Sequence, residues 1–290
     1  MLEIKNVSKS YGKKKALQDC SLIVNKHDIV GILGQNGCGK STLFKSVMGL
    51  IEYDSGEILF NHKPCDFDQR KRFGYMPEQR SLFLDLTLYE QLKFLAELKG
   101  LSLDFTNQQI DTLIERFDLK EKKHSVINKL SKGQQQKVQL IAALLHNPDV
   151  LILDEPLNGL DFYSVQIVMN ELKLQASMGK IILISSHQMD FMDELCTHLL
   201  VLNQGLTIKN GKLDNLYQDY GVCVSVNSDS LWHNISKTHK NILDKGSMIE
   251  FHYSNISEAK KALNYFSKES TITSLKLHNI SIGDMLKEFE

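Results

Sequence analysis

Residues 34–42 read GQNGCGKST, that is Gly34, Gln35, Asn36, Gly37, Cys38, Gly39, Lys40, Ser41 and Thr42. This stretch fits the pattern GxxxxGK[ST]. The five residues before it, 29–33, form a continuous apolar run (IVGIL), which is typical of a strand covered on both faces. Residues 40–50 have a helical pattern. A buried strand, a glycine-rich turn and a helix in this order predict a phosphate-binding loop (P-loop).

The residue types of this loop predict its chemistry. Glycines allow the backbone to wrap closely, so that successive N–H groups converge on phosphate oxygens at a helix N-terminus. We expect Lys40 to reach the β- and γ-phosphates and the Ser41 hydroxyl to bind Mg²⁺. A chance glycine-rich turn is the alternative. The strand before it and the helix after it favour nucleotide binding.

A second apolar strand, residues 150–153, ends in two carboxylates, Asp154 and Glu155. Alternation along a strand places them on opposite sides of the strand end, so that they can hold different roles. We expect Asp154 to hold Mg²⁺ and Glu155 to orient and deprotonate the attacking water. Taken alone, the pair reads as a solvated acidic turn. The upstream P-loop favours the catalytic interpretation.

Composition excludes several classes of protein. The net charge of −1 argues against nucleic acid as the main partner, because phosphate backbones select basic surfaces. The five cysteines are odd in number and lack CxxC spacing, which favours a reducing compartment. The N-terminus lacks the apolar core of a signal peptide, and no apolar run approaches the roughly 20 residues of a membrane helix. We therefore expect a soluble, cytoplasmic protein.

The chain of 290 residues predicts one large domain and a smaller one. Strands alternate with helices up to about residue 219, which predicts an α/β fold with a parallel sheet, and residues 82–147 have a helical pattern. After residue 220, Val222, Val224 and Val226 alternate with polar residues, and amphipathic stretches follow at 257–266 and 282–289. We expect domains at 1–219 and 220–290, the second a small α+β domain without a catalytic motif.

The order of further motifs carries a family resemblance. The P-loop is followed by residues 130–134 (LSKGQ), by Asp154 and Glu155, by residues 159–161 (GLD) and by His187. This order resembles the ABC ATPase family over roughly residues 1–215. The resemblance implies a P-loop NTPase core with a RecA-like parallel sheet, an antiparallel β subdomain and a helical subdomain. It also implies ATP as substrate, Mg²⁺ as cofactor, and hydrolysis coupled to transmembrane transport.

The resemblance assigns further roles. Ser131, Gly133 and Gln134 would meet the γ-phosphate held by the opposite subunit, although Ser131 and Gln134 also form a helix capping box. His187 would contact the γ-phosphate and the catalytic water, where a lone histidine is otherwise more often structural. Asp161 would link the two subunits' sites. Tyr11 would stack on adenine, and its alternative is packing at a strand end.

Two positions depart from the family pattern. Residues 130–134 correspond to the family's signature segment, which usually has two glycines. Lys132 replaces the first of them, which could alter closure of the dimer. The segment 75–79 (YMPEQ) resembles the loop whose glutamine senses Mg²⁺ and couples to the membrane domain. Spacing to residues 85–87 puts Glu78 at that position, as in exporter-type subgroups, whereas a one-residue shift would put Gln79 there. We favour Glu78.

The resemblance implies a second ATPase subunit, identical or related, and a separate membrane permease on the inner face of the cell membrane. One alternative is an ATPase that acts on ribosomes or DNA, which the single cassette and the lack of a long coiled coil disfavour. A second is a GTPase, which is disfavoured because the sequence has no guanine-recognition motif after the P-loop. A third is an importer subunit. Glu78, the short tail and residues 280–286 (ISIGDML) resemble ABC-2-type exporters of drugs, lipids or antimicrobial peptides. Staphylococcal phenol-soluble modulin exporters are one such system.

Overall fold

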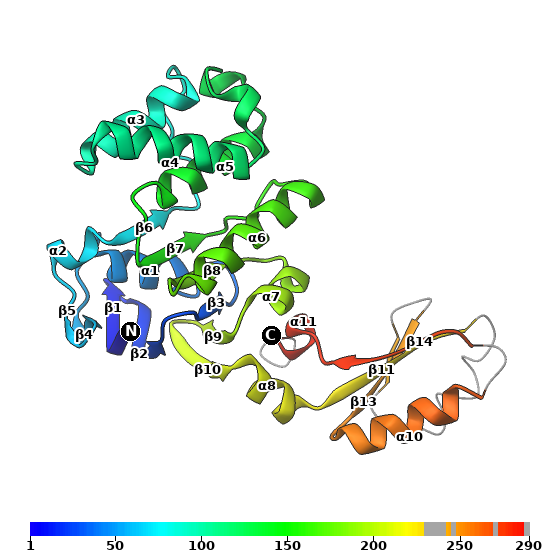
Figure 1. The fold of residues 1–290 in the computed structure, drawn as a ribbon. Helices are drawn as coiled ribbons and strands as arrows, with labels where there is room; N and C mark the ends of the chain where they lie inside the picture. Colours follow the sequence, from blue (N-terminus) through cyan, green and yellow to red (C-terminus); the bar gives the residue numbers. More distant parts are fainter. Residues whose placement is uncertain (229–241, 245–247, 269–271, 287–290) are drawn as a thin grey trace. The chain divides into compact units, whose positions relative to one another are not determined.

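The computed structural model describes residues 1–228, 242–244, 248–268 and 272–286 (Figure 1). Contacts divide the chain into two compact units, Met1–Asn210 and Gly211–Glu290. This division precedes helix α8 (Leu213–Tyr220), whereas the boundary expected after residue 219 falls at the end of that helix. Among the described helices, none combines the length and the apolar character needed to cross a membrane.

A ten-stranded sheet forms the first unit, in the order β5-β4-β1-β2-β10-β9-β3-β8-β7-β6. The β1–β2, β1–β4 and β4–β5 pairs are antiparallel, and the β9–β3, β3–β8, β8–β7 and β7–β6 pairs are parallel. The antiparallel part comprises β1 (Leu2–Tyr11), β2 (Lys14–Val24), β4 (Ser55–Phe60) and β5 (Lys63–Pro64). The remaining strands are β3 (Ile29–Leu33), β6 (Phe73–Met76), β7 (Val150–Asp154), β8 (Ile181–Ser185), β9 (His198–Asn203) and β10 (Leu206–Lys212).

Three neighbouring strands, β3, β8 and β7, make the centre of the parallel part β9-β3-β8-β7-β6. Every residue of β3, β7 and β8 is buried, as their continuous apolar runs predicted. Helix α1 (Lys40–Met48) contacts β2 and β7, and helix α6 (Phe162–Ser177) contacts β8. Two shorter helices are α2 (Phe67–Arg70) and α7 (Met189–Leu195). The predicted parallel sheet with an antiparallel β part is confirmed.

The predicted helical region contains α3 (Leu88–Leu98), α4 (Leu103–Arg116) and α5 (Lys132–Leu144), with 3-10 turns at Lys120–Lys122 and Ile127–Lys129. Helix α3 contacts both α4 and α5, and Figure 1 draws the three helices in cyan to green. Thr87 and Glu90 start α3 with a capping box, which satisfies N–H groups that have no partner within the helix. Gly100, with φ 72°, separates α3 from α4.

The second unit contains a four-stranded antiparallel sheet in the order β12-β13-β11-β14. Its strands are β11 (Val222–Ser228), β12 (Ile242–Asp244), β13 (Met248–Tyr253) and β14 (Ile272–Asn279). Helix α10 (Ile256–Phe266) packs through Phe266 on Val224 and Phe251. Helix α11 (Ile282–Leu286) lies in the predicted stretch 282–289, of which residues 287–289 are outside the described residues. The small C-terminal α+β fold is confirmed.

Candidate functional site

The P-loop joins β3 to α1 in a conformation that requires glycine. Gly34 has φ 140° and Gly39 has φ 122°. A Cβ atom on Gly34 would lie 2.1 Å from the carbonyl oxygen of Leu202, and one on Gly39 would lie 2.4 Å from the carbonyl oxygen of Ala16. The loop therefore runs directly against the backbones of β9 and β2, and this contact fixes its path.

The ammonium group of Lys40 lies inside this loop. Its Nζ donates hydrogen bonds of 2.7 Å to the carbonyl oxygen of Gly34 and 3.3 Å to that of Gln35. The residue is only 9% exposed. Lys40 is the first residue of α1, so its charge adds to the positive end of the helix dipole. A cation at a helix N-terminus is an arrangement that suits an anion.

Ser41 and Asp154 bring oxygen atoms together beside the loop. The Ser41 hydroxyl donates a 2.7 Å hydrogen bond to Asp154 Oδ2. The other carboxylate oxygen, Oδ1, accepts a 2.7 Å hydrogen bond from the Ser185 hydroxyl. Asp154 and Ser185 are direct partners in the β7–β8 register. A hydroxyl beside a carboxylate is an oxygen donor set that suits a hard divalent cation.

Glu155 follows β7 in a left-handed conformation, with φ 52°. Its backbone N–H donates a 2.9 Å hydrogen bond to the Ser185 hydroxyl. Strict alternation predicted that Asp154 and Glu155 would face opposite sides, yet both line one cavity. The expectation fails because Glu155 lies beyond the last residue of the strand and its positive φ breaks the alternation.

His187 lies over the Glu155 carboxylate. Its Nε2 is 3.3 Å from Glu155 Oε1, and its backbone N–H donates a 3.3 Å hydrogen bond to Oε2. Burial raises the pKa of Glu155, while His187 and Lys40 act in the opposite direction. The carboxylate is 8% exposed and the imidazole is 53% exposed. Glu155 is thus a nearly buried proton acceptor with one partly exposed partner.

These groups share a cavity of about 330 Å³. It is lined by Tyr11, Lys14, Ala16, Asn36, Gly37, Gly39, Lys40, Ser41, Thr42, Glu78, Asp154, Glu155 and His187. The remaining predicted P-loop residues, Gly34, Gln35 and Cys38, do not line it. Gly34 and Gln35 hold Lys40 through their carbonyl groups, and Cys38 is buried in the core. Tyr11 is half exposed, with Lys9 Nζ 5.6 Å from its ring centroid.

The signature segment lies elsewhere in the unit. Ser131 caps α5, accepting a 3.2 Å hydrogen bond from the Gln134 backbone N–H and donating its own backbone N–H to Gln134 Oε1 at 2.9 Å. Asp161 caps α6 by its side chain alone: its carboxylate accepts a 2.7 Å hydrogen bond from the Ser164 N–H, which holds the pKa of this carboxyl low. The lining of the cavity includes none of Ser131, Gly133, Gln134 and Asp161.

Sequence reasoning missed two residues that support this site. Ser185 bridges Asp154 and the Glu155 backbone, and its only signal was its place at the end of a buried strand. Gln136, on α5, donates hydrogen bonds to the carbonyl oxygens of Glu155 at 3.0 Å and Pro156 at 3.3 Å. Nothing in the local pattern of α5 marks it, because its partners lie on another element.

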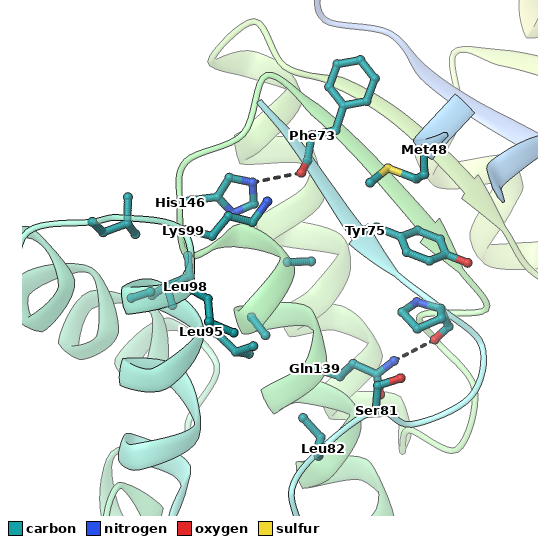
Figure 2. A pocket seen from close by; sticks show the side chains of 16 residues that line it. Met48, Phe73, Tyr75, Ser81, Leu82, Leu95, Leu98, Lys99, Gln139 and His146 are labelled. Carbon is teal, nitrogen blue, oxygen red and sulfur yellow. Dashed lines mark hydrogen bonds between the residues drawn. The ribbon is translucent and has the colours of Figure 1, made fainter. Parts of the chain in front are cut away.

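A second cavity, of about 320 Å³, lies between β6, α3 and α5 (Figure 2). Leu82, Leu95 and Leu98 line one part, and Tyr75 and Met48 another. His146 Nε2 lies 3.0 Å from the Phe73 carbonyl oxygen, and burial lowers the pKa of this histidine to about 4. His146 is therefore neutral at physiological pH, and the cavity is mostly apolar.

Comparison with known proteins identifies the class. Residues 17–158 match the protein family described as ABC transporter. An uncharacterized ABC transporter ATP-binding protein of Bacillus subtilis, YhaQ, is 36% identical over 230 residues, which is 79% of this chain and 77% of that protein. The lipopolysaccharide export system ATP-binding protein LptB of Haemophilus influenzae is 32% identical over 225 residues, 76% of this chain and 93% of that protein.

A solved structure agrees with these relatives. It is a dimeric ATP-binding cassette in a post-hydrolysis state, bound to ADP and Pi, with a TM-score of 0.67 and 25% identity. The match covers 73% of this chain and 99% of that chain. The chain belongs to the ATP-binding proteins of ABC transporters. It is an ATPase subunit that binds and hydrolyses ATP and powers an ABC transporter.

Proposed function

We propose that two copies of this chain, or one copy and a related subunit, close around two MgATP molecules. One observation carries this proposal. Ser131, Gly133 and Gln134 lie at the start of α5 and do not line the P-loop cavity of their own chain. A capped helix N-terminus attracts anions but here has no phosphate-binding loop of its own chain beside it. The related cassette that is dimeric in its solved structure supports a second subunit as the source of that loop.

The cavity residues have distinct roles in this proposal. Lys40 and the loop N–H groups bind the β- and γ-phosphates, Tyr11 stacks on adenine, and Asp161 links the two sites. Ser41 and Asp154 supply oxygen ligands for Mg²⁺, which would neutralise phosphate charge, and Glu78 approaches it from the loop after β6.

Glu155 accepts a proton from the attacking water, and burial, which raises its pKa, makes the carboxylate a stronger base than an exposed one. His187 contacts both carboxylate oxygens, its backbone N–H bonding Oε2 and its Nε2 lying 3.3 Å from Oε1, and so fixes the carboxylate that orients the water. Because the carboxylate is nearly buried, bulk water does not screen this interaction.

An ATP-dependent dimer tests the shared site. We expect Glu155→Gln to bind ATP without hydrolysing it and to shift from monomer to dimer on gel filtration with saturating ATP. Adding Ser131→Arg to the same chain should abolish the dimer, because the second half of the site is then blocked. A Glu155→Gln variant that stays monomeric with saturating ATP would show that the two-subunit model is wrong.

We propose further that the chain drives export of peptides, drugs or lipids through a separate permease on the inner face of the membrane. Glu78 and the relative named for lipopolysaccharide export favour this direction over import. The permease would contact the loop and helix at residues 78–90, which border the apolar cavity of Figure 2. Phenol-soluble modulins are amphipathic peptides that such a system would carry.

Direction is measured in membrane vesicles that contain the permease and this chain. Export predicts that inside-out vesicles accumulate a fluorescent amphipathic helical peptide with MgATP, and that Glu155→Gln abolishes the accumulation. ATP-driven uptake that occurs only in right-side-out vesicles loaded with MgATP would instead identify an importer.

A further inference from the structure

The C-terminal sheet has one apolar face and one polar face. Along β11, Val222, Val224 and Val226 pack with the core under α10. Side chains alternate along a strand, so Cys223 and Ser225 point to the opposite face. Side chains of this unit that can bind a metal lie on this second face.

The strand register brings three metal-binding residue types into one row. Cys223, on the central strand β11, is the direct partner of His252 on β13 and of His278 on β14. Ser225, two residues further, is the direct partner of Glu250. Direct partners in a sheet have Cβ atoms roughly 5 Å apart on the same face. A thiol, two imidazoles and a carboxylate therefore share one small area.

Their side-chain atoms converge. A sulfur atom from Cys223, a carboxylate oxygen from Glu250 and a ring nitrogen from His252 all lie within 4.8 Å of one another. Cys223 is fully buried, and Glu250 is 3% exposed. Tyr217, Tyr220 and Ile280, from the same unit, pack around Cys223 and shield this part of the face from solvent.

His278 completes the surroundings of the carboxylate. Its Nε2 lies 2.5 Å from the Ser225 hydroxyl and 4.0 Å from Glu250 Oε1. Its Nδ1 lies 2.7 Å from the carbonyl oxygen of Asn279. Both nitrogens thus have polar neighbours, which fixes the ring beside Glu250. A carboxylate held by neighbouring groups is typical of the surroundings of metal ligands.

We propose that Cys223, Glu250 and His252 bind a divalent transition-metal ion of the Zn²⁺ class. Mixed sulfur, nitrogen and oxygen donors suit zinc, whereas magnesium and calcium take oxygen ligands alone. Zinc bonds of about 2.0–2.3 Å place tetrahedral ligand atoms roughly 3.3–3.7 Å apart, a spacing that small side-chain rotations reach from the present separations. The fourth position takes water or His278.

The metal would join β11 to β13 and stabilise the folded C-terminal unit. Binding requires the thiolate, so the Cys223 S–H proton is released to solvent as the metal–sulfur bond forms. No electron is transferred in this step. The site is independent of the ATP-binding cavity, whose residues all lie in the first unit.

Cobalt substitution in the full-length chain, without nucleotide, tests the site. One equivalent of Co²⁺ should produce the near-ultraviolet band of thiolate-to-cobalt charge transfer, and Zn²⁺ should displace it. Cys223→Ser should lose the band and the zinc retained after desalting. Cys65→Ser removes a buried thiol from the first unit and serves as the matched control, which should keep both.

A second variant guards against misfolding of Cys223→Ser. His252→Gln alters a partly buried residue of the same group, and it should weaken zinc binding at least tenfold in a chelator competition. Zn²⁺ should raise the melting temperature of the wild type and of Cys65→Ser but not of His252→Gln. Absence of the band in the wild type, or full zinc binding in both Cys223→Ser and His252→Gln, would overturn the proposal and leave a metal-free polar cluster.

Discussion

The side-chain amide of Gln139 donates a 2.7 Å hydrogen bond to the backbone carbonyl of Pro77 (Figure 2). The same amide nitrogen lies 3.3 Å from the Gln79 carbonyl oxygen. Gln139 belongs to α5, the helix that Ser131 caps, and the two carbonyl groups flank Glu78 in the loop after β6. One buried side chain thus joins the signature helix to the loop that carries Glu78 into the cavity.

Gln139→Ala should therefore loosen this loop. We expect the free energy of unfolding to fall by about 1 kcal/mol for each hydrogen bond lost, and ATP hydrolysis to slow because Glu78 loses its anchor. Urea denaturation and steady-state ATPase rates measure the two effects. Gln108→Ala, an exposed glutamine of α4, is the matched control and should change neither quantity. Equal behaviour of the two variants would contradict the anchoring role.

The pKa of Glu155 predicts a pH-dependent effect on stability. Burial raises this pKa above its ordinary value of 4.5, so the folded protein resists ionisation of a group that ionises readily once unfolded. The stabilising contribution of the protonated group is complete below pH 4.5 and is lost as pH rises through the folded-state pKa. Glu155→Gln removes this loss. Its stability relative to the wild type should increase from acidic to neutral pH in urea denaturation, and a constant difference would contradict the prediction.

Two glycines with positive φ separate the effect of backbone strain from that of close contact. Gly100 has no atom within 4 Å of an added Cβ, so Gly100→Ala should cost only the left-handed conformation, about 1–2 kcal/mol. Gly34→Ala would also push a methyl group into the Leu202 carbonyl. It should cost more than about 3 kcal/mol and abolish ATP binding. Thermal unfolding and nucleotide titration measure both, and similar costs would contradict the contact argument.

Cys38 offers a chemical probe of the P-loop. Its side chain is 4% exposed and packs in the core beneath the loop. A thiol-alkylating reagent should inactivate the ATPase slowly, because reaction requires the loop to open, and MgATP should slow the inactivation further. The ATPase activity of the Cys38→Ser variant should be the same before and after treatment with the reagent. Unchanged wild-type activity after verified alkylation of Cys38 would contradict this prediction.

Local patterns were sufficient where one segment decides the structure. The apolar runs at 29–33 and 150–153 predicted buried strands, and the glycine-rich stretch predicted the turn between β3 and α1. The structure brings six of the nine predicted P-loop residues into the same cavity as Tyr11, Glu78, Asp154, Glu155 and His187. Their roles in binding and hydrolysis stay predictions.

Contacts between distant segments could not be predicted in this way. Ser185 meets Asp154 because β7 and β8 pair in one particular register, and these two continuously buried strands have no alternating pattern that would fix it. Alternation failed at Glu155 because a left-handed residue ends the strand. Likewise Cys223 and its partners His252 and His278 are unremarkable in the sequence and meet only when three strands align.

The bonds of Lys40 to the carbonyl groups of Gly34 and Gln35 have a consequence for the energetics of nucleotide entry. An ammonium group has three N–H donors, so the two carbonyl oxygens leave one of them for a phosphate oxygen. The same two bonds hold the cation in place, so less of the binding free energy is spent on ordering a flexible lysine side chain.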